Sequence, residues 1–351
     1  MCLEALTDTL LSNATNLMET FYFLGVDISK KKFDTALTMD GQHFHLAQVE
    51  NQSKFIEQFF KELRKQLSSF SKLIVCLEHT GIYSQPLLEV LIKNGIKVCV
   101  EPALQIKQSQ GMTRGKNDRV DAKRIALYAL KNQKELVFWQ PQRHCIQKLK
   151  ALLVTRERLV RTKVQLAVPV KESEEFIDPL IQKEMVRHCQ NSINALQKNI
   201  DKIEKAINDL VAQDIELTRQ YGLVISVPGI GKITALNIIV STGEFKKIDQ
   251  AKKFACYAGV APFEHTSGSS VRGKTRVSKM ANMRLKRLFH LAAMSAIRCC
   301  DELKVFYQRK VEAGKNKMSV INAVRNKLIS RVFACITHNR RYQKVYQIAL
   351  A

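Results

Sequence analysis

The stretch FYFLGVDISKKKFDTALTMDGQHFHLAQVEN, residues 21–51, decides the fold of the first part of the chain. An apolar run ends at Asp27, and two further runs rich in β-forming residues are separated by Asp40 and Gly41. An Asp-Gly pair between such runs is typical of a tight hairpin turn. The stretch therefore predicts three consecutive strands in an antiparallel meander.

Helices and buried strands alternate after this meander. The apolar spacing predicts a helix over 54–67, the strand KLIVCLE over 72–78 and a helix over 86–94. It then predicts the strand IKVCVEP over 96–102 and a further helix over 117–132. The order βββαβαβ followed by a helix predicts an α/β domain with a mixed sheet flanked by helices.

The pattern becomes helical beyond Pro141. Apolar residues within 193–210 recur at alternating steps of three and four, which is the repeat of a coiled coil. Two long helices, with a break near Pro169 and Pro179, fit an antiparallel hairpin or a dimer arm, and an ordinary helical bundle fits the same periodicity. We expect an N-terminal extension, an α/β domain, a helical coiled-coil linker and a helical C-terminal domain, with the boundaries 1–19, 20–138, 139–215 and 216–351.

The charge balance favours a polyanionic partner. The 351 residues include 56 Lys and Arg against 32 Asp and Glu, a net charge of +24. Residues 143–163, 265–300 and 304–344 are rich in Lys and Arg and contain only Glu157 and Glu312 as acids. Solvated helix faces explain one such run, but three favour a nucleic-acid surface, with double-stranded DNA as the expected partner.

Cysteine usage and hydropathy indicate a cytoplasmic protein. The nine cysteines form no CxxC pair and no zinc-finger spacing with histidine, so we expect reduced, mostly buried thiols. The N-terminus lacks a signal-peptide pattern, and the longest apolar stretch, 223–240, is interrupted by Pro228 and Lys232. Neither export nor a membrane partner is expected.

Four acids have the positions of a metal site. Asp27 and Glu78 end two apolar strands, while Asp118 and Asp121 open a helix at a spacing that puts them on one face. Phosphoryl transfer on DNA requires divalent ions, and Mg²⁺ or Mn²⁺ prefers carboxylate oxygens. Taken singly, each acid also fits a turn or a helix N-terminus.

The segment VPGIGKITA contains a candidate backbone-binding turn. Gly229 and Gly231, with Lys232 beside them, separate an apolar helix from the next helix, so that backbone amides can face a phosphate. This pattern is typical of a helix-hairpin-helix, and an ordinary helix-connecting turn is the alternative.

A serine-rich glycine loop lies within YAGVAPFEHTSGSSVRGKTRVSKMANMRLKRLF, residues 257–289. It is followed by four cations, which are Arg272, Lys274, Arg276 and Lys279. A hydroxyl among cations can attack a phosphodiester whose charge they stabilise. A flexible basic loop that only grips phosphate fits the same residues.

These motifs carry a resemblance to a known family. The pattern VDISK, EHTG and NDRVDA resembles the RNase H-like (RuvC-like) domain of DEDD transposases, which are related to Holliday-junction resolvases. The spacing of GVAP, TSG, RGK and SK is similar to that of the insertion-sequence one-ten family, the Piv/MooV-type transposases of prokaryotes. The likeness covers about residues 20 to 335.

The resemblance implies a mechanism. In that family the serine of the SG motif is the nucleophile, which corresponds here to Ser267, with Ser269, Ser270 and Ser278 as competitors. It implies a phosphoserine-DNA intermediate and a composite centre between protomers of a dimer or tetramer. It also implies that a structured non-coding RNA encoded in the element guides the protein, and that the protein is associated with the nucleoid.

This chain departs from the family at one position. The family often has Gly-Asn after the SK segment, whereas this chain has Ala281-Asn282. A glycine needed for a left-handed turn would be missed there, which puts the local geometry in doubt.

Three hypotheses follow from these observations. The first is an element-encoded recombinase with a magnesium-dependent DEDD site and a nucleophilic serine. The second is a metal nuclease or junction resolvase in which water attacks. The third is a non-catalytic protein that bridges DNA.

Overall fold

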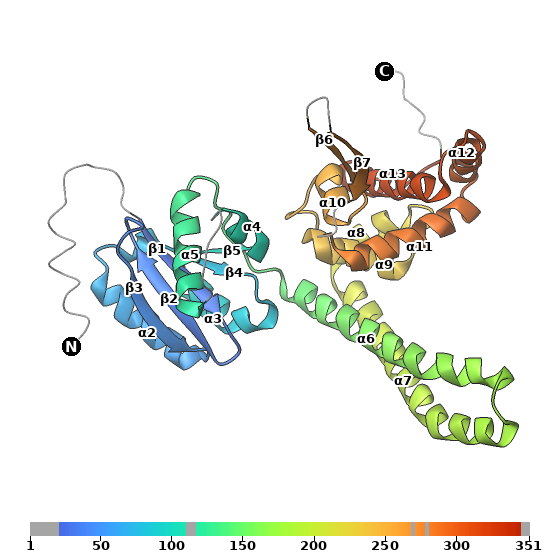
Figure 1. Ribbon diagram of the computed structural model, residues 1–351, viewed down its shortest axis with the longest axis horizontal. Helices are drawn as coiled ribbons and strands as arrows, with labels where there is room; N and C mark the ends of the chain where they lie inside the picture. Colours follow the sequence, from blue (N-terminus) through green and yellow to red (C-terminus); the bar gives the residue numbers. More distant parts are fainter. Residues whose placement is uncertain (1–20, 110–116, 268–270, 278–280, 345–351) are drawn as a thin grey trace. The chain divides into compact units, whose positions relative to one another are not determined.

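The computed structural model describes residues 21–109, 117–267, 271–277 and 281–344 (Figure 1). The expected N-terminal extension, residues 1–19, lies outside them. The chain divides into two compact units, Met1–Pro141 and Gln142–Ala351, and each is described by itself. Among the described residues, no helix has the length and apolar composition required to span a membrane.

A five-stranded mixed sheet forms the centre of the first unit. Its strands are β1 (Tyr22–Ile28), β2 (Lys32–Thr38), β3 (His45–Glu50), β4 (Leu73–Glu78) and β5 (Lys97–Glu101). They lie in the order β3-β2-β1-β4-β5. The first three pair antiparallel, whereas β4 pairs parallel with both β1 and β5. The predicted meander and mixed sheet are confirmed.

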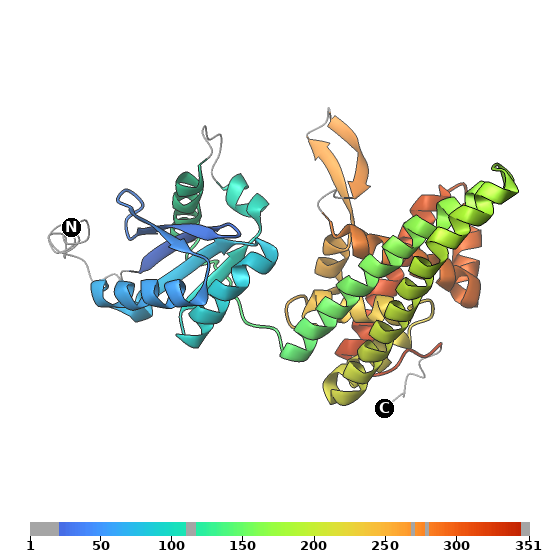
Figure 2. The ribbon, with the colours of Figure 1, turned by 90° about the horizontal axis from the view of Figure 1, so that it is seen from below.

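Helices cover both faces of this sheet (Figures 1 and 2). One face packs on α2 (Ser53–Gln66) and α3 (Gln85–Lys93), and the other on α4 (Ala103–Gln108) and α5 (Asp118–Lys131). Short 3-10 helices span Phe70–Lys72 and Gly81–Ser84. Alternation along β1 explains the two layers, because Leu24 faces the first pair of helices and Phe23 the second.

The second unit begins with a long helical hairpin. Helices α6 (His144–Glu172) and α7 (Pro179–Gln213) lie side by side, joined through a 3-10 turn at Ser173–Glu175 (Figures 1 and 2). Pro179 is the first residue of α7, where its missing N–H costs nothing. The helix pair is therefore an intrachain antiparallel hairpin.

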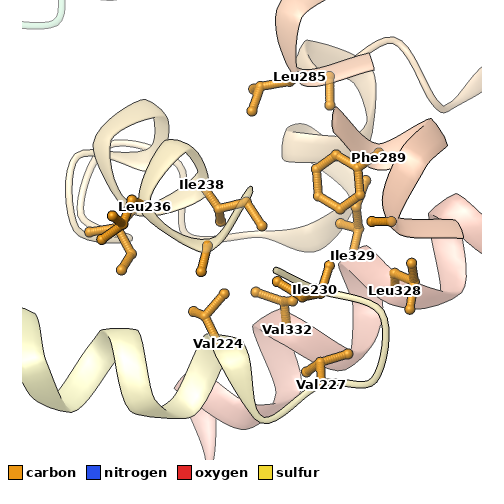
Figure 3. Packing of buried hydrophobic residues seen from close by; sticks show 14 of the residues in the cluster. Val224, Val227, Ile230, Leu236, Ile238, Leu285, Phe289, Leu328, Ile329 and Val332 are labelled. Atoms are coloured by element: carbon orange, nitrogen blue, oxygen red, sulfur yellow. The ribbon is translucent and has the colours of Figure 1, made fainter. Parts of the chain in front are cut away.

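The described part of this unit also contains six shorter helices. They are α8 (Ile215–Ile225), α9 (Lys232–Thr242), α10 (Ala251–Tyr257), α11 (Met283–Cys299), α12 (Asp301–Glu312) and α13 (Lys317–Thr337). Figure 3 shows their core, to which Phe289 of α11, Leu328 of α13 and Ile230 contribute buried side chains.

The expectation that no strands follow Pro141 is wrong. An antiparallel hairpin, β6 (Pro262–Ser267) and β7 (Val271–Val277), stands where a Gly/Ser-rich loop was predicted. β-branched residues on both sides of the short glycine-serine segment favour strands, and this local pattern outweighs its turn-like composition. The C-terminal domain is thus helical with one added hairpin.

Candidate active site

The end of β1 brings Asp27 beside Glu78. Val26 pairs with Leu77 in the parallel ladder between β1 and β4, so Asp27 and Glu78 occupy the next matched position. Residues matched in this way point to the same face of a sheet. Both carboxylates therefore lie at one sheet edge, as the sequence predicts.

Helix α5 brings the other two acids to the same place. Asn117 caps its N-terminus by accepting a hydrogen bond from the Arg119 backbone, and Asp118 and Asp121 lie in its first turn. Close packing sets the helix on β1, because a Cβ built on Gly25 would lie only 2.2 Å from the carbonyl oxygen of Ala122. The absence of a side chain at Gly25 thus positions two of the acids.

The four acids interact electrostatically. The pKa of Asp27 is raised from 3.8 to about 6, first by burial and then by neighbouring carboxylates, which are Asp121, Asp118, Glu78 and Asp34 in order of effect. Repulsion of this kind favours either a proton or a cation at the site.

The carboxylates are close but do not form a closed metal cage. Within the described parts of the chain, no three acidic, histidine or cysteine side chains are arranged to hold an ion as they stand. Asp121 accepts a hydrogen bond from the Arg124 guanidinium at 2.7 Å, so one of its oxygens is engaged. The donors are nevertheless all carboxylates, the ligand type that fits a hard divalent cation.

Sequence reasoning missed Asp34 and its partner Gln48. Asp34 is the register partner of Asp27 on β2, and Gln48 is the partner of Asp34 on β3. An acid inside a strand pattern gives no signal by itself. Counting the register from the short turn between β1 and β2, residues 29–31, is the step that pairs Asp34 with Asp27.

The structure describes the two strands on either side of the glycine-serine segment. Ser267 is the last residue of β6 and pairs with Val271, while Arg272 pairs with Thr266 and Arg276 with Phe263. Lys274 lies between these two cations on β7. Lys279 and the competing serines, Ser269, Ser270 and Ser278, lie outside the described residues.

Ala281 and Asn282 directly precede α11. Asn282 caps this helix by accepting a hydrogen bond from the Leu285 amide. The position at which this chain departs from the family thus stands next to a capped helix N-terminus.

The segment around Gly229 and Gly231 joins α8 to α9. Gly229 has a φ of +86°, and a Cβ there would lie 2.5 Å from that of Ala296 on α11. Gly231 is the N-cap of α9 and has open space around it. The Lys232 ammonium donates to the side-chain oxygen of Asn208. Gly229 thus has a packing role, whereas Gly231 leaves room for a ligand.

Comparison with known proteins identifies the class to which these features belong. A transposase family model matches residues 24–172, which include the sheet and the four acids. The chain is thus an enzyme that cuts and rejoins DNA. A second model, described as transposase IS116/IS110/IS902 family, matches residues 221–308, so the chain contains two transposase domains of the kind found in this family.

Relatives of similar length carry related names. The pilin gene-inverting protein of Moraxella bovis is 28% identical over 92% of this chain and 98% of its own length. The transposase for insertion sequence element IS1111A of Coxiella burnetii is 26% identical over 65% of this chain and 68% of its own. The T. thermophilus RuvC structure in complex with a Holliday junction substrate covers 32% of this chain and 95% of its own, at 12% identity. Its TM-score of 0.27 is too low to support a conclusion.

Proposed function

We propose that this transposase cuts and rejoins DNA with divalent cations held by Asp27, Glu78, Asp118 and Asp121 and with Ser267 as nucleophile. The observation that carries the proposal is the burial of Asp27 among carboxylates from β1, β4 and α5. Without a cation this arrangement destabilises the fold, because like charges are held together away from water.

The carboxylates would bind and orient the cations at the scissile phosphate. Mg²⁺ or Mn²⁺ held there would withdraw charge from the phosphoryl oxygens and from the leaving oxygen. Asp27 is the central ligand in this scheme, since it lies between Glu78 on β4 and the start of α5. Asp118 is exposed, whereas Asp27 and Asp121 are half-buried, so DNA would approach from the side of Asp118.

The proposed strand transfer has two steps. The Ser267 hydroxyl attacks phosphorus, a phosphoserine bond forms, and the bond to one strand oxygen breaks. The proton that the serine gives up is balanced by the proton that this leaving oxygen takes up, so that the cut strand ends in a free hydroxyl. A hydroxyl of another DNA end then attacks the phosphoserine, which restores the serine and forms the new phosphodiester. The match of residues 221–308 to the IS116/IS110/IS902 family model and the position of Ser267 beside the basic strand β7 support this assignment. Arg272, Lys274, Arg276 and Lys279 would hold the phosphate charge.

Nucleic-acid binding is assigned to the second unit. Gly229, Gly231 and Lys232 would form a backbone contact at the N-terminus of α9. The resemblance further implies a structured guide RNA and a dimer or tetramer, and both belong to the proposal. The name of the Moraxella relative, a pilin gene-inverting protein, supports DNA inversion as a reaction of the same kind.

Trapping of a covalent adduct tests the proposal. The full-length protein is incubated with Mg²⁺, element DNA and the RNA transcribed beside the gene, then denatured and run on a gel. We expect a protein-DNA adduct in the unmodified protein and in Ser319→Ala, an exposed serine of α13. Ser267→Ala and Asp27→Asn should each abolish it.

The outcomes separate the parts of the proposal. Product formation by Ser267→Ala with no adduct would show attack by water and leave a nuclease. Full recombination by Asp27→Asn would remove the metal site from the mechanism. Recombination that is unaffected by removal of RNA would contradict the proposal that an RNA guides the enzyme.

A further inference from the structure

Four polar residues form one row across the sheet. The register pairs Gln48 with Asp34 and Asp34 with Asp27, and Glu78 follows on β4. All four are matched positions on adjacent strands, so their side chains share a face of the sheet. It is the face on which α5 packs, since Gly25, two residues before Asp27, contacts this helix. Asp34 thus extends the carboxylate row by one strand.

The surroundings of Asp34 do not neutralise its charge. Asp34 is only 3% exposed. The Gln48 amide nitrogen donates to both carboxylate oxygens, at 3.0 and 3.2 Å. An Arg119 guanidinium nitrogen lies 4.0 Å from the Asp34 carboxylate, and the Arg119 side chain is 66% exposed. A neutral donor and a solvated arginine fix the carboxylate in place but compensate its charge only weakly.

Placing two acids opposite each other has a cost in stability. Asp34 and Asp27 are direct cross-strand partners, and like charges at such positions destabilise a sheet. An asparagine at position 34 would keep the size and the bonding capacity toward Gln48 without the repulsion. Packing therefore gives no reason for a carboxylate at this position, whereas a cation in the row does.

We propose that Asp34 is a positioning residue of the cation site, whose fixed negative charge strengthens cation binding by Asp27 and its neighbours. The inference rests on the proposed function. Asp34 acts through Asp27 and does not itself touch the cation, because its two oxygens are engaged by Gln48.

The test measures Mn²⁺ affinity of the full-length protein at pH 8 by electron paramagnetic resonance. Asp34→Asn should weaken binding about 10-fold or more, which is the usual effect of residues behind the ligands. Glu50→Gln is the matched control, because it removes one exposed charge from β3 in the same sheet. We expect its affinity to stay within about twofold of the unmodified protein, since solvent screens that charge.

A second readout separates charge from structure. Trp139 is the only tryptophan and packs on the core of the first unit, so its fluorescence reports the unfolding of this unit. Metal-free Asp34→Asn should be as thermally stable as the unmodified protein or more so. Asp34→Ser, a smaller replacement, should show the same loss of affinity.

Each outcome bears on one claim. If Asp34→Asn and Asp34→Ser bind Mn²⁺ as tightly as Glu50→Gln, or if their only change is lower thermal stability, Asp34 is merely structural and the inference is overturned. If the unmodified protein binds no Mn²⁺, or if Asp27→Asn has no effect on binding, the proposed metal site itself fails.

Discussion

The carboxylate of Asp27 lowers the stability of the folded, metal-free protein. Asp27 is half-buried, and every acid that shifts its pKa raises it. The folded, metal-free protein therefore holds the Asp27 proton more tightly than the unfolded chain does. Residues kept at such a cost are typical of functional sites.

A pH dependence follows from this shift. Since the pKa of Asp27 is about 6 when folded and 3.8 in its ordinary state, the metal-free protein should lose stability as pH rises from about 4 to about 6. Above that range the loss is complete and constant. Asp27→Asn should remove the loss and add about 1–2 kcal/mol at pH 7, which is less than the full shift corresponds to because solvent screens the half-exposed carboxylate. Urea unfolding followed by Trp139 fluorescence measures it, and a stability that rises over this range would contradict the assignment.

The contact at Gly25 links the packing of α5 to the acids. A Cβ there would overlap the helix backbone at Ala122 and Ala126, at 2.2 and 2.3 Å. Gly25→Ala should therefore destabilise the first unit by about 3 kcal/mol and weaken Mn²⁺ binding, because the start of α5 moves away from β1. Gly231→Ala, the same change in open space, is the control. Unchanged Mn²⁺ affinity in Gly25→Ala would show that α5 does not position ligands.

At the level of elements, the sequence predicts strands correctly where apolar runs and turn residues alternate regularly. The apolar run before Asp27 and the turn at Asp40-Gly41 predict the meander, and the run ending at Glu78 predicts the parallel strand beside it. The β6-β7 hairpin was missed because its turn residues resemble a loop. The role of Asp34 was missed because cross-strand partners depend on register, which local propensity does not provide.

The two glycines between α8 and α9 should respond differently to substitution. Gly229→Ala meets both a positive φ and the backbone of α11, so we expect a loss of about 2–4 kcal/mol. Gly231→Ala should change stability by less than about 0.5 kcal/mol yet weaken DNA binding severalfold, since its Cβ would stand at the N-terminus of α9. Thermal melts and fluorescence anisotropy measure the two effects. If Gly231→Ala binds DNA as tightly as the unmodified protein, the segment between α8 and α9 is only a helix-connecting turn.

At the level of the whole molecule, charge divides unequally between the units. Residues 1–141 contain 18 Lys and Arg and 15 Asp and Glu, so 21 of the 24 net positive charges belong to residues 142–351. An almost neutral unit that contains the acids and a strongly basic one suit separate tasks. The first would hold cations, and the second would hold nucleic acid.

This division predicts a salt dependence. Duplex DNA affinity should fall at least about 100-fold between 50 and 200 mM salt. Replacing Arg272, Lys274 and Arg276 together by glutamine should reduce the slope of log affinity against log salt by about 2–3. The matched triple change on α2, at Lys54, Lys61 and Lys65, should leave the slope unchanged. If the two triple changes reduce the salt slope equally, the proposed division of tasks between the two units is contradicted.

The central claim is that the carboxylates of β1, β4 and α5 bind divalent cations. Anomalous X-ray diffraction from crystals of the full-length protein grown with Mn²⁺ tests it most directly. We predict anomalous peaks within coordination distance of the Asp27 and Glu78 oxygens, and their loss in Asp27→Asn. Well-ordered Asp27 and Glu78 with no peak beside them, at a Mn²⁺ concentration that supports catalysis, would contradict the claim.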